Sequence, residues 1–234
     1  MIQRERLGDV EVLRLDRPQR RNAMDTALLE ALQAALEELA ADDALGAVVF
    51  STTDVRAHSA GADVGEELDA AGGVARMQRF TELYAAVEAF PALTVAVCVG
   101  NCVGAGAELA AGCDLRVAGD NLKLAWAGAR HGVPVGPARL VPLVGLARAK
   151  DLVLSGRVVG GEEARAIGFA GGLVPAGEAE AHALEVAAAC GGLSARQLKA
   201  MFRDLEGTAA RVTYENARLM AFQREGAGLP RRRA

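Results

Sequence analysis

The stretch 94–114, TVAVCVGNCVGAGAELAAGCD, constrains the fold more than any other part of the sequence. It begins with an apolar, β-branched run and breaks at Gly100 and Asn101. It then continues into an alanine-rich segment whose one charge is Glu108. This order predicts a strand, a glycine turn and a helix. The small residues of that helix allow its backbone to approach another part of the chain closely.

Ala105 and Glu108 lie on one face of the expected helix, because three residues make nearly one turn, a rise of ~4.5 Å. Amides at the start of a helix have no intrahelical acceptor and face outward as donors. The residues around Glu108 are Ala, Leu and Gly as far as Gly112, and burial among apolar groups raises the pKa of a carboxyl. This face therefore suits both stabilising negative charge and moving a proton. The alternative is a Glu that only favours the helix dipole.

Composition excludes several classes of protein. A chain of 234 residues can bury the core of one domain, and 51% hydrophobic with 24% charged residues is typical of a soluble globular protein. A net charge of −4 gives no reason to expect nucleic acid as a partner, and the basic residues near the C-terminus are typical of a solvated tail. Because no apolar run could span a bilayer and the N-terminus is unlike a signal peptide, we expect no membrane association and a cytoplasmic location.

The cysteines and histidines do not suggest a metal site. Cys98, Cys102 and Cys113 lie in the Ala/Gly-rich central stretch, where buried free thiols are expected. The sequence has no C-x-x-C pair, and its histidines are scattered. We therefore expect no metal.

Strands and helices alternate in the first half of the sequence, and helices dominate the second half. Strands are expected at 10–15 (edge or half-buried), 47–51, 94–99 and 115–118, and helices at 26–41 with Asp25 as the N-cap, 74–90, 138–154 with an interruption at Pro142, 162–167 and most of 178–223. Such alternation predicts an α/β fold with parallel crossovers. No repeat or linker marks a domain boundary, and the helical last third could dock on its own domain or on a neighbour's.

Two Gly/Ala turns, 60–63 and 104–108, each follow an expected strand. Two backbone N–H groups from such turns could converge on one oxygen, as in an oxyanion hole. The alternative is two ordinary tight turns between core elements. The sequence lacks G-x-S-x-G, G-x-G-x-x-G and G-x-x-x-x-G-K-[ST], which sets aside an α/β-hydrolase elbow, a dinucleotide-binding turn and a P-loop.

Four motifs follow one another along the chain: DRPQRRNAM at 16–24, AHSAGAD at 57–63, VGNCVGAGAELAAGCD at 99–114, and the pair 154–156 and 164–175. Together they resemble the crotonase superfamily, also called the enoyl-CoA hydratase/isomerase family. The family versions are an N/D-R-P-x-x-x-N-A-[LM] turn, an F-x-A-G-A-D loop, an N-G-x-x-x-G-x-G-x-E-L-x-x-x-C-D segment and an L-x-G … A-x-x-x-G-L-V-x-x-V-x-P region. His58 stands where the loop usually has Phe.

The resemblance implies a fold and an assembly. The fold is a spiral of ββα units followed by a helical C-terminal trimerisation region. Residues 1–175 would form the core with the acyl-CoA site, and 176–234 the C-terminal part of the same domain unit, with a truncated tail. The implied assembly is a homotrimer or a dimer of trimers.

The resemblance also implies an acyl-CoA thioester as the substrate, with no separate cofactor because coenzyme A enters as part of the substrate. The amides of Ala62 and Ala105 would hold the thioester oxygen as an enolate forms, and Glu108 would act as acid or base. The implied substrate-binding residues are Arg20, Arg21, Ala60, Gly61, Ala62, Asp63, Val64, Gly104 and Ala105.

The sequence departs from the family at a second catalytic position. Hydratases of the family use two glutamates, and Gly128 stands where the second belongs. The following stretch, 132–140, is shorter than its family counterpart. His131 is a candidate replacement proton donor, or only a polar loop residue.

Three functions therefore stay open. The first is an enoyl-CoA hydratase or isomerase. The second is an acyl-CoA-binding paralogue with little or no turnover. The third is another reaction on the same scaffold, thioester hydrolysis or decarboxylation.

Overall fold

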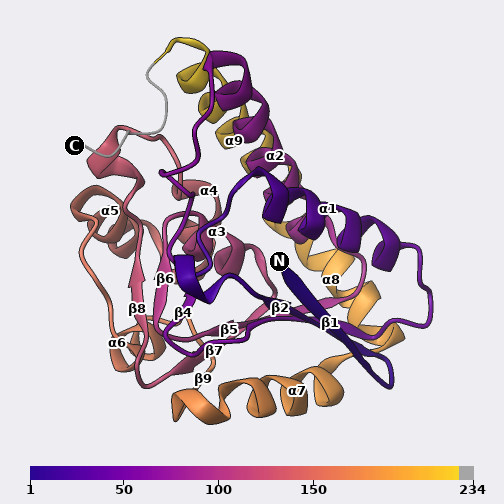
Figure 1. Ribbon diagram of the computed structural model, residues 1–234. Coiled ribbons are helices and arrows are strands. Elements are labelled where there is room, and N and C mark those ends of the chain that lie inside the picture. The colour runs from indigo at the N-terminus through magenta and orange to yellow at the C-terminus, as the bar shows by residue number, and fades with distance from the viewer. Residues whose placement is uncertain (227–234) are drawn as a thin grey trace.

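The computed structural model describes residues 1–226, so the basic stretch 230–234, expected to be a solvated tail, lies outside the described residues. Figure 1 shows the order of the elements. The strands are β1 (Ile2–Leu7), β2 (Val10–Leu15), β3 (Ala47–Thr52), β4 (Ala57–Ser59), β5 (Leu93–Cys98), β6 (Asn101–Val103), β7 (Leu115–Gly119), β8 (Lys123–Ala125) and β9 (Gly172–Val174). The helices are α1 (Thr26–Ala40), α2 (Ala70–Ala89), α3 (Ala105–Gly112), α4 (Pro137–Val144), α5 (Leu146–Ser155), α6 (Gly161–Ala166), α7 (Ala179–Cys190), α8 (Leu193–Glu206) and α9 (Thr208–Arg224), with short 3-10 helices η1 (Pro18–Arg20), η2 (Gly128–His131) and η3 (Ala176–Glu178).

The strands form two sheets, and a repeated strand–strand–helix unit contributes one strand to each sheet. The larger sheet has the order β1-β2-β3-β5-β7-β9, and the smaller one has the order β4-β6-β8. Every pairing between these strands is parallel except the β1–β2 hairpin. Three successive units place one strand in each sheet and then a helix: β3-β4-α2, β5-β6-α3 and β7-β8-α4. The α/β class and the ββα units are therefore confirmed.

Helices cover both faces of the larger sheet. On one face, Leu28, Leu32 and Leu36 of α1 are buried in the main core, as their spacing predicts. Asp25 caps this helix, accepting a hydrogen bond from the Leu28 amide at 2.9 Å. On the other face, α7 packs its alanines against β3, β5 and β7 and runs beneath the sheet in Figure 1. The first C-terminal helix thus docks on its own domain.

The prediction that strand 10–15 lies at an edge or is half-buried is wrong. β1 pairs with β2 along its whole length, from Ile2 opposite Leu15 to Leu7 opposite Val10, so β2 is an interior strand. β1 was not predicted, because most side chains of its sequence, IQRERL, are exposed and charged and show no apolar alternation. β4, β6, β8 and β9 were not predicted either, since three residues are too few to show a period.

The helix expected at 138–154 is broken at Gly145 and not at Pro142. Gly145 has a φ of +80°, which ends α4 and begins α5. Pro142 stays inside α4, where it leaves the Ala138 carbonyl without its intrahelical donor. The guanidinium of Arg211 on α9 donates to that carbonyl instead. The proline therefore creates a docking point for the C-terminal helix.

Within residues 1–226 no helix is both long and apolar enough to cross a membrane, and no group of three His, Cys, Asp or Glu side chains is arranged to hold a metal ion. Cys98, Cys102 and Cys113 are buried free thiols, as predicted, and Cys190 is exposed.

Candidate active site

The two Gly/Ala turns lie directly against each other. A Cβ placed on Gly61, whose φ is +99°, would lie 2.9 Å from the Val103 carbonyl oxygen and 3.5 Å from the Ala105 nitrogen. A Cβ on Gly106 would lie 2.7 Å from Ser59 Cβ. Both positions need glycine because the end of β4 touches the start of α3. The sequence predicted the two turns, and the structure brings them together.

The amides of Ala62 and Ala105 have no acceptor among the described residues. The Met24 amide donates to the Gly61 carbonyl at 2.7 Å, and the Asp63 amide donates to the Met24 carbonyl at 2.9 Å. This bridge fixes the loop and leaves the Ala62 N–H unused. Ala105 is the first residue of α3, so its N–H has no intrahelical acceptor. Two amide donors without an acceptor among the described residues therefore lie where the two turns meet.

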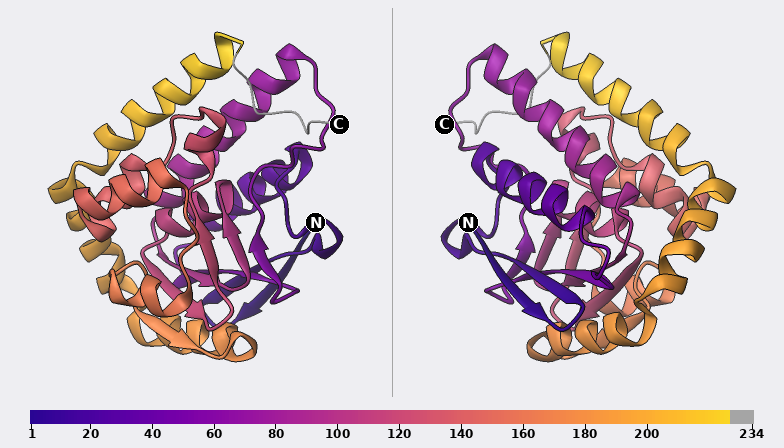
Figure 2. Two further views of the ribbon diagram at one scale, coloured as in Figure 1. Left: turned by 90° about the vertical axis from the view of Figure 1, so that its left-hand side faces the viewer. Right: turned by 90° about the vertical axis from the view of Figure 1, so that its right-hand side faces the viewer.

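A cavity of about 150 Å³ opens onto both turns and is otherwise mostly apolar. Its lining from the turns is Ala60, Gly61, Ala62, Val64, Val103, Gly104 and Ala105, and from elsewhere Met77, Phe80, Tyr84, Ala127, Gly128, His131, Val133, Val135 and Leu219. Leu219 comes from α9, which lies beside α2 in both views of Figure 2. We name this space the acyl cavity. Its size and lining suit a short apolar group held with one polar atom at the turns.

The basic turn lies beside the loop 60–65. The Ala60 amide donates to the Arg21 carbonyl at 2.9 Å, and both Arg20 and Arg21 have exposed side chains. The Asp63 carboxylate is engaged within the protein, accepting hydrogen bonds from Arg17 at 3.2 Å and from the Gly65 amide at 2.9 Å. Asp63 therefore shapes the loop, whereas the exposed arginines remain free for a phosphate. Substrate contacts of these residues stay predictions.

Glu108 is completely buried and does not line the acyl cavity as the described residues define it. Its Oε2 accepts a hydrogen bond from Arg139 Nη1 at 3.1 Å, and the same Nη1 donates to Glu215 Oε1 at 2.7 Å. Burial, helped by the nearby Glu215 carboxyl and opposed by Arg139, raises the pKa of Glu108 to about 8. The apolar neighbours of Glu108 in the sequence predicted that its pKa would be raised. The charged partners, which come from α4 and α9, were not predicted.

The other carboxyl oxygen, Glu108 Oε1, is buried and has no hydrogen-bond partner in the described structure. The indole Nε1 of Trp126 is also unpaired, but its N–H lies near enough to Glu108 to favour the ionised carboxyl and so to lower its pKa. A Cβ placed on Gly136 would lie 3.4 Å from this oxygen and 2.9 Å from Trp126 Cδ1. Gly136 has a φ of +118° and carries no side chain that could fill this region. Oε1 is therefore the oxygen of Glu108 that Arg139 leaves without a hydrogen-bond partner among the described residues.

Valine residues pack around Gly128, the position at which the sequence resemblance predicts a missing glutamate. Gly128 lines the acyl cavity, but a Cβ there would lie 2.8 Å from Val135 Cγ1 and 3.1 Å from the Val133 carbonyl oxygen. Val133 and Val135 thus pack against the place where a side chain at residue 128 would project. His131 also lines the cavity, with an exposed side chain.

Comparison with known proteins gives the family. The model of the family described as "Enoyl-CoA hydratase/isomerase" matches residues 5–227. A putative enoyl-CoA hydratase from Thermus thermophilus is 37% identical over 198 residues, which are 80% of this chain and 78% of the relative. The 2,3-dehydroadipyl-CoA hydratase of Escherichia coli is 33% identical over 181 residues, 76% of this chain and 71% of that one.

Solved structures agree. A Bacillus anthracis enoyl-CoA hydratase superposes with a TM-score of 0.82 at 25% identity, covering 94% of this chain and 91% of its own. An enoyl-CoA hydratase/isomerase from Xanthobacter autotrophicus shares the fold with a TM-score of 0.86 at 24% identity, covering 98% of this chain and 88% of its own. The fold, the paired turns and these matches all lead to one assignment: the chain belongs to the enoyl-CoA hydratase/isomerase family, the crotonase superfamily.

Proposed function

We propose that the protein is an acyl-CoA enzyme in which the amides of Ala62 and Ala105 stabilise a thioester enolate and Glu108 moves the proton. The observation that carries this proposal is the pair of unused amides that meet at one apolar cavity. Donors preorganised in a site of low polarity stabilise an oxyanion far better than water does. The raised pKa of Glu108, about 8, suits a carboxyl that must accept a proton near neutral pH.

In this scheme the thioester oxygen lies between the two amides, and the acyl chain occupies the space between α2 and α9. Loss of a proton next to the thioester carbon moves negative charge onto that oxygen, where the amides receive it. The exposed Arg20 and Arg21 are placed beside the loop 60–65, which suits contact with the phosphates of coenzyme A. The scheme needs no further cofactor, because coenzyme A enters with the substrate.

Migration of a double bond fits this site better than hydration does. Moving a proton between two carbons needs one carboxyl, whereas addition of water is divided between two carboxyls in the family's hydratases. Gly128 cannot contribute the second, and Val135 occupies part of its place. We therefore expect hydration of crotonyl-CoA to be about 10²–10⁴-fold slower than in a relative with two glutamates, the usual contribution of one positioned acid or base.

Turnover of a panel of purified enoyl-, β-keto- and malonyl-type CoA thioesters tests the proposal. Double-bond migration on at least one enoyl-CoA, with hydration that is weak or absent, is the expected result. Crotonyl-CoA hydration near the diffusional ceiling of ~10⁸ M⁻¹s⁻¹ would show that Gly128 is no handicap. Thioester hydrolysis or decarboxylation as the fastest reaction would replace the proposed activity with another one of the same scaffold.

One observation favours a second candidate, an acyl-CoA-binding paralogue with little turnover. Glu108 is tied to Arg139 and is 0% exposed, as expected of a structural ion pair. Calorimetric binding of several acyl-CoA thioesters with no turnover of any of them would favour this candidate over the enzyme.

We also propose that the chain assembles as a homotrimer or a dimer of trimers. Its support is a row of exposed apolar side chains on α8, at Leu198, Met201, Phe202 and Leu205, the last of which is 81% exposed. Such a surface is typical of an interface between subunits. Light scattering coupled to gel filtration should give three or six times the chain mass. A monomer at micromolar concentration would refute this assembly.

A further inference from the structure

One guanidinium holds three carboxyl groups from three other helices. Arg139 of α4 contacts Glu108 of α3 at 3.1 Å, Glu215 of α9 at 2.7 Å and Glu88 of α2 at 2.9 Å. The side chains of Arg139 and Glu108 are fully buried, and those of Glu215 and Glu88 nearly so. We call these four residues the Arg139 cluster. The ring of Tyr84 covers the guanidinium at 4.6 Å.

The Arg139 cluster has fewer positive charges than carboxyls. Two further cations, Arg203 and Arg211, favour the ionised form of Glu88 through their charge, but among the described residues they donate to the carbonyls of Ala89 and Ala138 and not to the cluster's carboxyls. Three ionised carboxyls around one buried guanidinium would leave uncompensated charge, which is costly in a protein interior. We therefore expect the cluster to hold at least one proton. Burial raises the pKa of Glu88 to about 7 as well, so Glu108 and Glu88 are its main candidates.

The C-terminal helix is tied to this cluster at two points. Glu215 Oε2 accepts a hydrogen bond from the Ala138 amide at 2.8 Å while Oε1 accepts one from Arg139. Arg211, one turn earlier on α9, donates to the Ala138 carbonyl that Pro142 leaves free. The same helix supplies Leu219 to the acyl cavity. α9 thus lines the acyl cavity through Leu219 and binds Arg139, the hydrogen-bond partner of Glu108, through Glu215.

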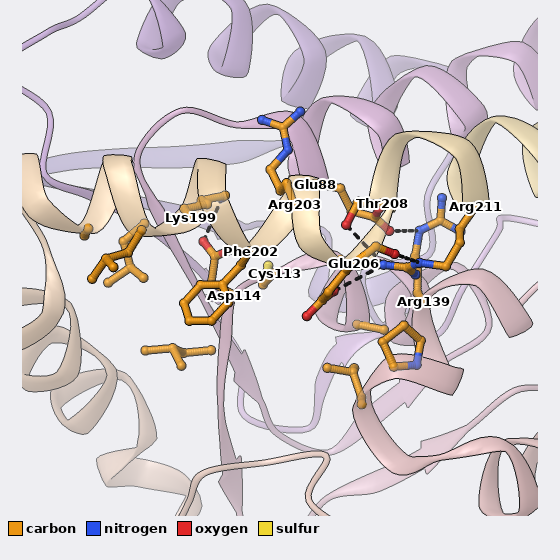
Figure 3. Close-up of a pocket in the computed structure, with 18 of the residues that line it drawn as sticks. Glu88, Cys113, Asp114, Arg139, Lys199, Phe202, Arg203, Glu206, Thr208 and Arg211 are labelled. Atoms are coloured by element: carbon orange, nitrogen blue, oxygen red, sulfur yellow. Dashed lines mark hydrogen bonds and ion pairs between the residues drawn. The ribbon is translucent and has the colours of Figure 1, made fainter.

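Figure 3 shows a second cavity, of about 500 Å³, that Arg139 and Glu88 line together with Glu206, Thr208 and Arg211. Glu206 and Thr208 are hydrogen-bonded to the Arg211 guanidinium. Lys199 and Asp114 form a separate pair, with a distance of 2.7 Å between Nζ and Oδ2. The cluster is therefore bordered by space that is distinct from the acyl cavity.

We propose that Arg139 and Glu215 are positioning residues, which fix Oε2 of Glu108, leave Oε1 for the substrate, and make the protonation of Glu108 depend on the docking of α9. This proposal rests on the proposed function of Glu108 as acid or base. Arg139 supplies the attraction that favours the ionised form, and the Glu215 carboxyl supplies the repulsion that opposes it. The charged and titratable groups that act on Glu108 are Tyr84 from α2, Arg139 from α4 and Glu215 from α9, and Glu88 from α2 contacts the same Arg139.

The test is a carbon-13 NMR titration of the glutamate carboxyls in the whole protein. Glu108→Gln identifies the Glu108 signal by its loss. Glu215→Gln keeps an oxygen for Arg139 and for the Ala138 amide but removes the negative charge. We expect it to lower the midpoint of Glu108 by about one pH unit, a tenfold change in the ionisation constant. Arg139→Gln should raise the midpoint of Glu108, and Arg139→Lys, which keeps a positive charge, should bring it part of the way back to the value of the parent protein.

Glu206→Gln is the matched control, because Glu206 forms an ion pair with Arg211, does not belong to the Arg139 cluster and has a half-exposed side chain. It should leave the midpoint unchanged. A midpoint that stays in place in a folded Glu215→Gln protein would overturn the proposal, even if Arg139→Gln fails to fold.

The pH profile of kcat/KM separates this proposal from the proposed function. If Glu108 is the base, the acidic limb should move to lower pH in Glu215→Gln by the same amount as the NMR midpoint. If Glu108→Gln keeps full activity, the proposed function fails. If Glu108→Gln is inactive and neither the limb nor the midpoint moves in Glu215→Gln, only the positioning proposal fails.

Discussion

Glu108→Gln should lower turnover of the best acyl-CoA substrate by about 10²–10⁴-fold, the usual loss when a positioned acid or base is removed. Glutamine keeps the size and polarity of the side chain and an oxygen for Arg139, but it cannot take up the proton. Arg139 keeps its contacts with Glu215 and Glu88, which should preserve the fold. Steady-state kinetics on the best thioester of the panel measures the effect. Full activity would move the chemistry elsewhere, with His131 as the next candidate.

Glu108→Gln should also change how the folding stability depends on pH. The ordinary pKa of the Glu108 carboxyl is 4.5, and burial in the folded protein raises it to about 8. Between these pH values the folded state binds the proton more tightly than the unfolded chain does, so folding stability falls as the pH rises. Glutamine removes this loss. The melting temperature of Glu108→Gln, relative to the parent, should therefore be higher at pH 8 than at pH 5, and an unchanged difference would contradict the raised pKa.

The centre of the site could be predicted because its signals are local. The turn before α3 and the position of Glu108 follow from a run of glycine and alanine after an apolar strand. The sequence predicted that the two turns could meet, and the structure shows their contact at Gly61 and Gly106, where β4 touches α3. What the residues alone left open was whether these were ordinary turns. The unused amides now favour a site.

The environment of Glu108 could not be predicted, because it depends on contacts that no local pattern reports. Arg139 is 31 residues from Glu108 along the chain, and Glu215 is a further 76 residues from Arg139. Neither residue stands out in the sequence: Arg139 lies at the start of the helix expected at 138–154, and Glu215 lies on a polar helix. The spiral itself was expected from family resemblance and not from periodicity, since β4, β6 and β8 have three residues each.

Ala105→Pro should lower kcat/KM by about 10²–10³-fold, the typical effect of losing one oxyanion-hole donor, in a protein that still folds. Proline deletes the N–H of residue 105 and suits the first position of a helix, where that N–H makes no intrahelical bond. The preceding residue, Gly104, has a φ of 53° and a ψ of −116°, outside the α region that proline disfavours in its predecessor. The substitution therefore removes the donor with little demand on the backbone.

Ala105→Gly is the matched control, because it keeps the N–H and removes only a methyl group; it should retain most of the activity. The Ala62 amide remains in both variants, so a residual rate above background is expected from Ala105→Pro. Circular dichroism and the melting temperature check that this protein is folded. If a folded Ala105→Pro protein turned over acyl-CoA as fast as Ala105→Gly, the thioester oxygen would not lie at this amide. The pair of turns would then be a packing feature of the fold, and the acid–base chemistry of Glu108 would need another acceptor for the developing charge.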